Sequence, residues 1–266
     1  MKTPVYFIAD IHLHTFPTAA EEQKKRLLSE FLDEVRAHQG TLFIVGDMFD
    51  FWFEYRYVIP GCYFRVLRQL QELTDSGCEV HFIGGNHDYW MKDFFSTELH
   101  ISVHSQSLDT VIHNRRFFIT HADGILPEES GYRRWRTIMR SRLAIRLFGF
   151  LHPDVAYRFG SFISSRSRRL NLRPPEEDEA ERQALIHYGQ SLFADGFQHV
   201  ITGHFHLPTV YREERNVFLN LGDWIRYFSF GYFDGDNLNL AYWGSPRKPE
   251  NLKKSEFFLD LKYRIF

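Results

Sequence analysis

The sequence predicts an α/β protein in which two packed sheets, or one large mixed sheet, are flanked by helices. Three features support this prediction. Strand-like and helix-like runs alternate early in the chain, short strand-like runs crowd its C-terminal part, and an arginine-rich helical segment interrupts the alternation. The 266 residues, 44% apolar and 25% charged, have the composition of an ordinary globular protein. This length can build one large core, so we expect a single domain over residues 1–266.

Short apolar, β-branched or aromatic runs mark the expected strands. Five fit buried strands: Val5–Ala9, Leu42–Val45, Val80–Ile83, Arg116–Thr120 and His199–Thr202. Amphipathic patterns over Glu21–His38 and Phe64–Ser76 separate the first three and predict helices. This alternation is typical of parallel strand pairs. Between Pro208 and Trp243 the runs PTVYR, NVFLNL, FSFGYF and LNLAYW follow at short spacing and predict mostly antiparallel strands.

The net charge of the whole chain is close to zero, but the arginine-rich segment is strongly basic. Gly131–Arg173 holds eleven Arg, no Lys and one acid, Asp154, or about +10, whereas the remainder has 21 basic and 33 acidic residues, or about −12. Arginines interleaved with large apolar residues at helical spacing predict one or two cationic amphipathic helices. We expect them to form an insertion over approximately 127–195, between the fourth and fifth strands. Such helices suit an anionic membrane surface, or their arginines form salt bridges with the acidic remainder.

The composition also argues against several classes of protein. A net charge of −2 argues against a dedicated nucleic-acid binder, so no nucleic-acid partner is expected. Two cysteines, Cys62 and Cys78, indicate neither a disulfide framework nor a zinc–thiolate site. The N-terminal apolar run is too short for a signal peptide, and no run reaches the ~18 residues of a membrane span. We therefore expect a cytoplasmic protein; nothing in the sequence indicates its oligomeric state.

Each of the five strand-like runs is followed by residues of the types that commonly bind metals. Since the carboxyl ends of parallel strands form ligand-binding crevices, we expect these side chains to meet. Imidazole, carboxylate and amide oxygen without sulfur suit Mn, Fe or Zn. Seven such residues are too many for one ion but fit two ions sharing a carboxylate, the arrangement that hydrolyses phosphoesters. They are Asp10, His12, Asp47, Asn86, His121, His204 and His206.

The motifs DxH, GDxxD, GNHD, THAD and GHFH, in this order, resemble the calcineurin-like metallophosphoesterase superfamily. The resemblance implies that superfamily's fold, with two packed mixed sheets flanked by helices, and two divalent ions, most often Mn²⁺. It also implies that His87 contacts the phosphate and protonates the leaving group, and that Asp88 orients His87. The implied ligands are Asp10, His12, Asp47 and His206 for one ion, and Asp47, Asn86, His121 and His204 for the other, with Asp47 bridging.

A closer resemblance, carried by GDMFDFW, GYRRWR and the insertion after THADG, is to the UDP-2,3-diacylglucosamine hydrolases of bacterial lipid A synthesis. It implies cleavage of the pyrophosphate of UDP-2,3-diacylglucosamine to UMP and 2,3-diacylglucosamine 1-phosphate, by in-line attack of a metal-bridging hydroxide. The insertion would be a lid over the acyl chains and would hold the enzyme on the inner face of the inner membrane. The implied substrate contacts are Asn86, His87, Glu129, Tyr132 and Arg136.

The match has departures, and they leave alternatives open. The best-known enzymes of this family have Arg where this chain has His87, and the THADG and LGDW (Leu221–Trp224) blocks also differ from their forms. One alternative is a soluble dimetal phosphodiesterase or phosphatase acting on a nucleotide or another small phosphoester. Another is a non-catalytic interaction module on the same fold. Asp50 and Asp123, close in sequence to predicted ligands, are expected to support them by hydrogen bonds.

Overall fold

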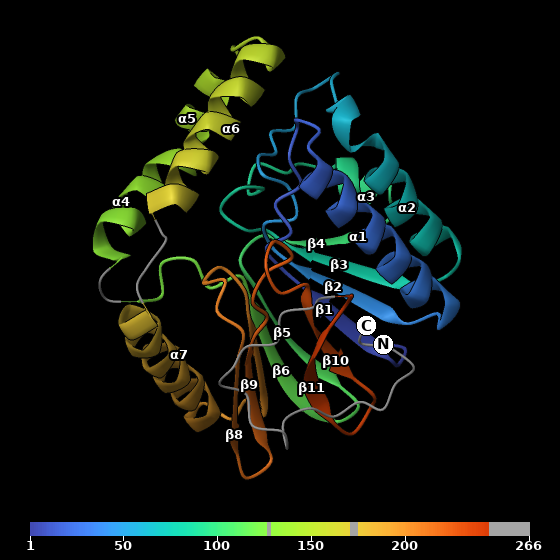
Figure 1. Cartoon of the computed structure of the whole chain (residues 1–266), viewed down its shortest axis with the longest axis vertical. Coiled ribbons are helices and arrows are strands. Elements are labelled where there is room, and N and C mark those ends of the chain that lie inside the picture. The colour runs from blue at the N-terminus through green and yellow to red at the C-terminus, as the bar shows by residue number, and fades with distance from the viewer. Residues whose placement is uncertain (127–128, 171–174, 245–266) are drawn as a thin grey trace.

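Two mixed β-sheets pack face to face, and helices cover the outer face of each (Figure 1). In the computed structural model of the chain, residues 1–126, 129–170 and 175–244 are described. The order of layers is helices, first sheet, second sheet, helix. The prediction of two packed mixed sheets flanked by helices is confirmed.

The first sheet has six strands in the order β11-β10-β1-β2-β3-β4. Neighbours from β1 to β4 are parallel, whereas β10 pairs antiparallel with β1 and with β11. The strands are β1 (Val5–Ile8), β2 (Thr41–Val45), β3 (Glu79–Ile83), β4 (Ser102–His104), β10 (Ser229–Phe233) and β11 (Leu238–Tyr242).

The second sheet has five strands in the order β5-β6-β7-β9-β8. Its central strands β6, β7 and β9 are parallel, and the edge strands β5 and β8 pair antiparallel. The strands are β5 (Ser107–Ile112), β6 (Arg115–Thr120), β7 (His199–Thr202), β8 (Thr209–Glu213) and β9 (Asn216–Asn220).

Alternating side chains of the strands build two cores. Val5 and Phe7 of β1 face the second sheet. The Phe7 ring stacks on Phe43 of the neighbouring strand β2 at 5.1 Å and on Phe117 of the second sheet at 6.1 Å. Tyr6 and Ile8 face the other way, toward the helices. The helices on this side are α1 (Ala19–Ala37), the 3-10 turn η1 (Gly61–Tyr63), α2 (Phe64–Asp75) and α3 (Phe94–Thr97).

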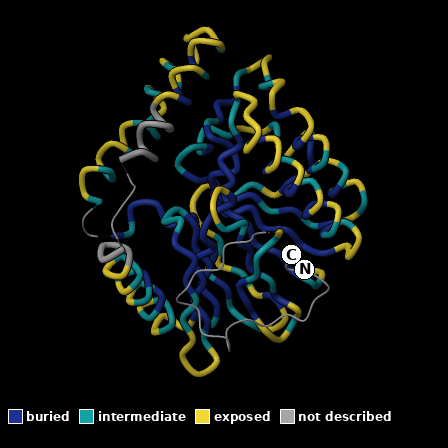
Figure 2. Tube along the Cα trace, viewed as in Figure 1, coloured by how far each residue is buried: buried dark blue, intermediate teal, exposed yellow. Residues whose placement is uncertain are grey.

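The described part of the insertion between β6 and β7 contains four helices: α4 (Ser130–Met139), α5 (Arg142–Phe148), α6 (Pro153–Leu170) and α7 (Pro175–Ala194). Helices α4 to α6 stand away from the sheets and carry many exposed residues (Figures 1 and 2). Helix α7 instead packs on the second sheet, with Leu185 against Val200 and Phe218. The segment that projects from the sheets, referred to below as the lid, is α4–α6 alone (Figure 1).

The lid has three helices where one or two were predicted. Ser141 separates α4 from α5 because its hydroxyl caps α5, accepting a hydrogen bond from the Ala144 amide at 3.2 Å. Pro153 is the first residue of α6, a position where its missing N–H costs nothing. Local capping chemistry thus divides a segment whose apolar pattern is continuous.

The four strands predicted in the C-terminal part of the chain are all present. β8 pairs antiparallel with β9 and β10 with β11, as expected, yet the two hairpins belong to different sheets and β9 lies parallel to β7. Strands β4 and β5 were not predicted, because three-residue β4 is too short for a pattern and β5 alternates exposed polar side chains.

Candidate metal centre

The seven predicted ligands come together where the carboxyl ends of both sheets' parallel strands meet. The loops after β1, β2 and β3 approach this point from the first sheet, and those after β6 and β7 approach from the second. Three groups of side chains place their ligand atoms within 4.8 Å of one another: Asp10, His12 and His206; His12, Asp47 and His87; and Asp47, His121 and His204.

Asp10 anchors the first group. Its Oδ2 accepts a hydrogen bond from the His204 amide at 2.8 Å, while its Oδ1 lies 3.6 Å from His206 Nε2 and 3.8 Å from His12 Nε2. Among the described residues this Oδ1 has no hydrogen-bond partner, although it is buried. A buried carboxylate oxygen left in this way is costly unless a cation meets it.

Asp47 belongs to the second and third groups, and His12 joins it to the first. Its Oδ1 accepts a hydrogen bond from the His87 amide at 2.9 Å. Its Oδ2 lies 3.4 Å from His121 Nε2 and 3.7 Å from His12 Nε2. One oxygen is thus fixed by the backbone and the other faces imidazoles on both sides, the placement that a bridging carboxylate needs.

Asn86 completes the group around His121. Its Oδ1 lies 3.1 Å from His121 Nε2 and 3.0 Å from His204 Nδ1. An amide oxygen, a carboxylate and two imidazoles form a donor set that suits divalent transition-metal ions. The side chains fit such ions in type and in spacing.

The electrostatics around Asp47 also favour cations. Burial by itself would raise the pKa of Asp47, but the charges of His121 and His87 outweigh burial and hold that pKa well below its ordinary value. Burial lowers the pKa of His121, yet the carboxylate of Asp47 raises it to about 10. Without metal the imidazole therefore holds a proton, which a bound cation would displace.

Oxygen atoms behind the centre orient its imidazole rings. The Nδ1 of His121 donates to the Val45 carbonyl at 2.9 Å, and the Nδ1 of His206 lies 3.3 Å from the Asp223 carboxylate. Both rings therefore turn Nε2 toward the centre. Charges on His206 and Arg226 overcome the burial of Asp223 and lower its pKa to about 2.

Sequence reasoning missed Asp223, although a signal was present. Asp223 follows β9, which lies parallel to β7, so the rule that selected the residues after the other parallel strands applies to it. The run NVFLNL was expected to pair antiparallel, so the rule for parallel strands was not applied to the residues that follow it.

The expected role of Asp88 was wrong. Its carboxylate does not orient His87 but accepts hydrogen bonds from the amides of Gly85 at 2.8 Å, Met48 at 2.8 Å and Asp47 at 3.2 Å. Asp88 therefore ties the loop after β3 to the loop after β2. The ring of His87 is oriented instead by the Asp50 carbonyl, which accepts from Nδ1 at 2.8 Å.

The loops that carry the centre have unusual backbones. Each left-handed non-glycine residue costs on the order of 1–3 kcal/mol and persists only where its surroundings hold it. Gly85 keeps a negative φ, but a side chain there would collide with the Asp47 carboxylate. Five of the predicted ligands are left-handed: Asp10 (φ 54°), His12 (46°), Asp47 (53°), His204 (73°) and His206 (53°).

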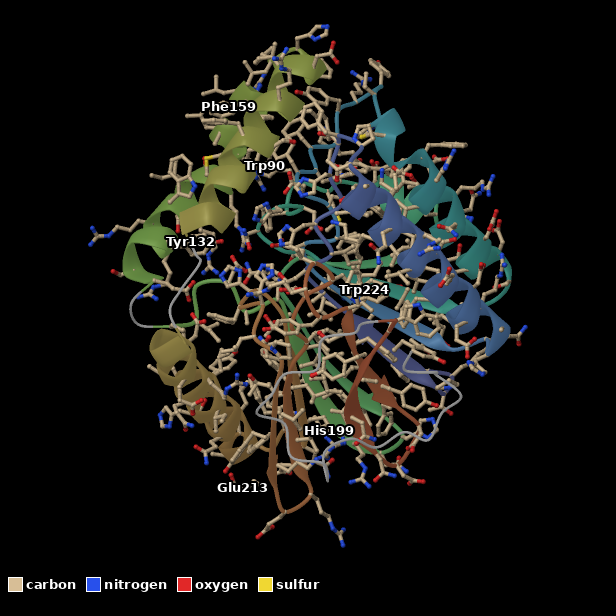
Figure 3. All side chains as sticks on the ribbon, viewed as in Figure 1. Trp90, Tyr132, Phe159, His199, Glu213 and Trp224 are labelled. Atoms are coloured by element: carbon tan, nitrogen blue, oxygen red, sulfur yellow. The ribbon has the colours of Figure 1, made fainter. Side chains whose placement is uncertain are left out.

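The predicted substrate contacts lie in the centre (Asn86 and His87), next to it (Glu129) and on the first lid helix (Tyr132 and Arg136). Glu129 Oε1 is 3.4 Å from His204 Nε2, so Glu129 contacts a candidate ligand. Tyr132, on α4, donates to Asp123 Oδ2 at 3.0 Å, and Arg136 NH1 lies 3.2 Å from the same oxygen. Asp123 thus holds the first lid helix beside the centre, where Figure 3 labels Tyr132.

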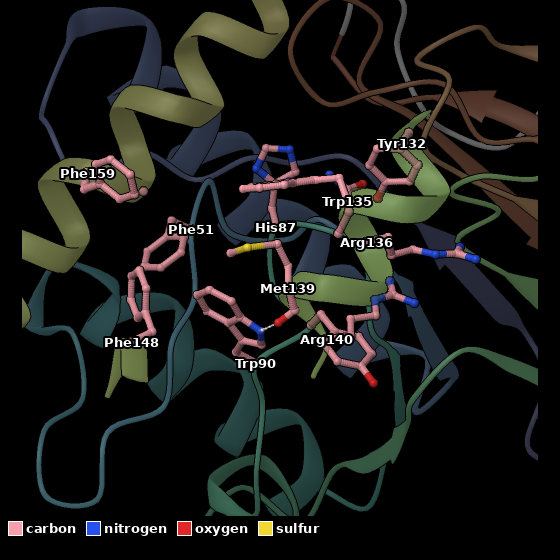
Figure 4. A pocket seen from close by; sticks show the side chains of 13 residues that line it. Phe51, His87, Trp90, Tyr132, Trp135, Arg136, Met139, Arg140, Phe148 and Phe159 are labelled. Atoms are coloured by element: carbon pink, nitrogen blue, oxygen red, sulfur yellow. Dashed lines mark hydrogen bonds between the residues drawn. The ribbon is translucent and has the colours of Figure 1, made fainter. Parts of the chain in front are cut away.

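A cavity of about 240 Å³ leads from the centre into the lid (Figure 4). Asn86 and His87 form its polar end, with Tyr132, Arg136 and Arg140 beside them. The rest of the wall is apolar. It includes Phe51 and Trp90 from the core loops, and Trp135, Met139, Phe148 and Phe159 from α4, α5 and α6, with Tyr89 and Gly160 completing the lining.

Comparisons with known proteins agree with this geometry. Residues 3–208 match the model of the calcineurin-like phosphoesterase family. The chain is similar to three proteins, each described as UDP-2,3-diacylglucosamine hydrolase. That from Porphyromonas gingivalis is 32% identical over 90% of this chain and 97% of its own length. Those from Proteus mirabilis and Neisseria meningitidis serogroup B are 29% identical over 77% and 82%, and 27% identical over 88% and 95%, of this chain and of their own.

Proposed function

The chain belongs to the calcineurin-like phosphoesterase family, and we propose that it hydrolyses the pyrophosphate bond of UDP-2,3-diacylglucosamine to UMP and 2,3-diacylglucosamine 1-phosphate. Membership of this family makes it a phosphoester hydrolase that uses divalent metal ions. The lipid substrate rests on its hydrolase relatives and on one structural observation, the cavity.

That cavity joins two kinds of surface. Its polar end carries the candidate metal ligand Asn86 together with His87, and its far end is walled by Phe148 and Phe159 of the lid (Figure 4). A pyrophosphate linked to acyl chains requires both surfaces side by side. A small hydrophilic phosphoester would leave the aromatic wall in contact with water, at a cost of about 25 cal/mol per Å² of apolar surface.

We propose two Mn²⁺ ions, one held by Asp10, His12, Asp47 and His206, and the other by Asp47, Asn86, His121 and His204. When bound, such ions supply Lewis-acid charge to the phosphate oxygens and activate a water molecule.

His87 contributes a proton-carrying group beside them. Its Nδ1 donates to the Asp50 carbonyl, so Nε2 lies on the opposite side of the ring, 3.8 Å from Asp47 Oδ2 at the polar end of the cavity. The protonated ring can there contact the phosphate or protonate the leaving oxygen. The guanidinium groups of Arg136 and Arg140 line the same end and neutralise phosphate charge.

A lipid assay with added Mn²⁺ tests this function. We expect UMP and 2,3-diacylglucosamine 1-phosphate to appear in equal amounts. Hydrolysis of a bis-aryl phosphate ester without any release of UMP would contradict the lipid substrate and would leave a dimetal phosphodiesterase.

We further propose that the lid rests on an anionic membrane surface, the cytoplasmic face of the inner membrane. Leu143, Leu147, Phe150 and Phe162 are 59–78% exposed on the lid. Arg136 and Arg140 pair with Asp123, but the described residues offer no acidic partner to the lid arginines Arg134, Arg142, Arg146 and Arg158. Among the residues that the structure describes, no helix is long and apolar enough to cross a membrane.

Sedimentation with vesicles tests the membrane contact. Phe150→Ser, at a side chain 78% exposed on the lid, should weaken binding to phosphatidylglycerol vesicles. Phe64→Ser is the matched control, because Phe64 is 64% exposed on α2, outside the lid. Equal binding by both variants and the wild type would rule out this membrane contact.

A further inference from the structure

A buried lysine lies directly behind the loop that carries Asp10 and His12. Lys24, on α1, is 5% exposed, and its Nζ donates to the carbonyls of Ile11 at 2.9 Å and His12 at 2.6 Å. Glu21, one turn earlier on the helix and 2% exposed, pairs with the ammonium at 2.9 Å. No motif of the sequence pointed to this pair.

The pair completes the hydrogen bonding of a strained segment. His12 is left-handed, with φ 46°. On one side of the segment the amides of His12 and Leu13 donate to the carbonyls of Asp47 at 2.9 Å and Met48 at 3.0 Å. On the other side Lys24 meets the carbonyls, and Glu21 Oε1 accepts from the amide of His14 at 2.9 Å. The backbone of His12 is therefore held from both faces.

Stability alone gives no reason for this choice of residues. A buried ion pair is often no better than well-packed apolar residues of similar size, since both charges lose their hydration. Helix α1 already faces the core with Leu27, Leu28 and Phe31, so an apolar residue at position 24 would fit its pattern. What an apolar residue lacks is a donor for the two carbonyls.

We infer that Lys24 and Glu21 are positioning residues for the metal centre: they hold the His12 backbone in the conformation that points its imidazole at Asp10 and Asp47. The inference rests on the proposed metal centre. It assigns the pair to one of the two ions, the one bound by Asp10, His12, Asp47 and His206, because the residues held are those of the loop after β1.

Metal binding by the apoprotein tests the inference without an activity assay. Mn²⁺ is titrated calorimetrically into the wild type, Lys24→Met and Lys25→Met. The control is closely matched, because Lys25 neighbours Lys24 on the same helix and pairs with Glu22 at 3.3 Å with the same spacing, but on the exposed side. We expect Lys24→Met to weaken one of two ions by about 10- to 100-fold, as is typical for groups that orient ligands. The second ion and Lys25→Met should behave as in the wild type.

Two further variants keep the test decisive if Lys24→Met does not fold. Lys24→Arg retains the charge and the donors and should retain both ions, whereas Glu21→Gln removes the counter-charge and should weaken the same single ion. Thermal unfolding in EDTA records any purely structural effect. A lower melting temperature with two ions bound at wild-type affinity would overturn the inference. A wild type that binds no Mn²⁺ would instead overturn the metal centre itself, and the inference with it.

Discussion

Both proposed ion sites depend on Asp47, because its Oδ2 lies between His12 and His121. Asp47→Ala should remove a ligand from both ions. Activity should fall by more than ~100-fold, the upper end of what losing a merely supporting residue costs. Metal content, measured by atomic emission, should fall with it. Asp109→Ala is the control, since Asp109 is an exposed aspartate paired with Arg116 on β5 and β6. Wild-type turnover by Asp47→Ala would contradict the dimetal centre.

His87 has two possible roles, proton donor and metal ligand, and substitution of His87 distinguishes them. As a proton donor it should contribute ~10²–10⁴-fold to turnover. His87→Ala should then slow hydrolysis of the lipid pyrophosphate strongly and leave the Mn²⁺ content near that of the wild type. A nitrophenyl ester, whose leaving group needs no proton, should be much less affected. If metal content falls in proportion to activity, His87 binds metal, as its proximity to His12 and Asp47 permits.

The residues of the centre were predictable because a simple rule governs them: polar residues that follow parallel strands meet at one edge. The rule gave all seven candidate ligands, and it would have given Asp223 if the parallel neighbour of β9 had been known. It could not give Lys24, whose contacts are with backbone carbonyls, nor the contacts of Asp88, which bonds to amides of two loops. The sequence around Lys24 and Asp88 has no periodicity or motif that predicts these contacts with the backbone.

At the scale of elements, a contact between the lid and the core shapes the cavity. Gly160 of α6 lies against the ring of Phe51, and a Cβ at position 160 would overlap that ring. Gly160→Ala should push Phe51 into the cavity that it lines. A lipid that binds must then push the ring back into the overpacked position, which costs about 1–3 kcal/mol. Because 1.4 kcal/mol is tenfold in affinity, KM for the lipid should rise roughly tenfold.

Steady-state kinetics on two substrates checks this prediction. Gly131→Ala, on α4, is the matched control, because a Cβ there meets nothing within 4 Å. A small soluble phosphodiester should be hydrolysed normally by both variants. An unchanged KM for the lipid in Gly160→Ala would show that the acyl chains do not occupy the aromatic part of the cavity.

Helices and strands were predicted correctly where the apolar pattern was long. They were missed where a helix cap or a contact with a distant residue determined the structure. Helices α1 and α2 and the strands that bear the candidate ligands agree with their predicted ranges to within two residues at each end. The division of the lid at Ser141 came from a cap, and the placement of α7 on the second sheet came from contacts of Leu185 with residues far along the chain. Neither the cap nor the long-range packing can be predicted from the local periodicity of apolar residues.

For the whole molecule, the buried histidine His199 links folding to pH. It is 2% exposed at the start of β7, with its ring 4.6 Å from that of Phe117 and 5.8 Å from that of Phe233. Burial, together with the charges of Arg115 and Arg212, lowers the pKa of His199 to about 4. Figure 3 places it among the strands, far from Tyr132 and Trp90 near the lid, so its effect on stability is separable from catalysis.

The sign follows from which state binds the proton first. In the unfolded chain a histidine has a pKa near ~6.5, so between pH 6.5 and about 4 the unfolded state is protonated while native His199 is not. Its contribution to stability is present above pH 6.5 and is lost as the pH falls toward 4, by an amount on the order of 2–3 kcal/mol. His199→Phe removes this loss. Urea unfolding in EDTA, compared at pH 8 and pH 5, should show the variant gaining relative to the wild type at the lower pH. His187→Phe, at an exposed position on α7, is the matched control. A difference between His199→Phe and the wild type that is the same at both pH values would mean that native His199 takes up its proton as readily as the unfolded chain does.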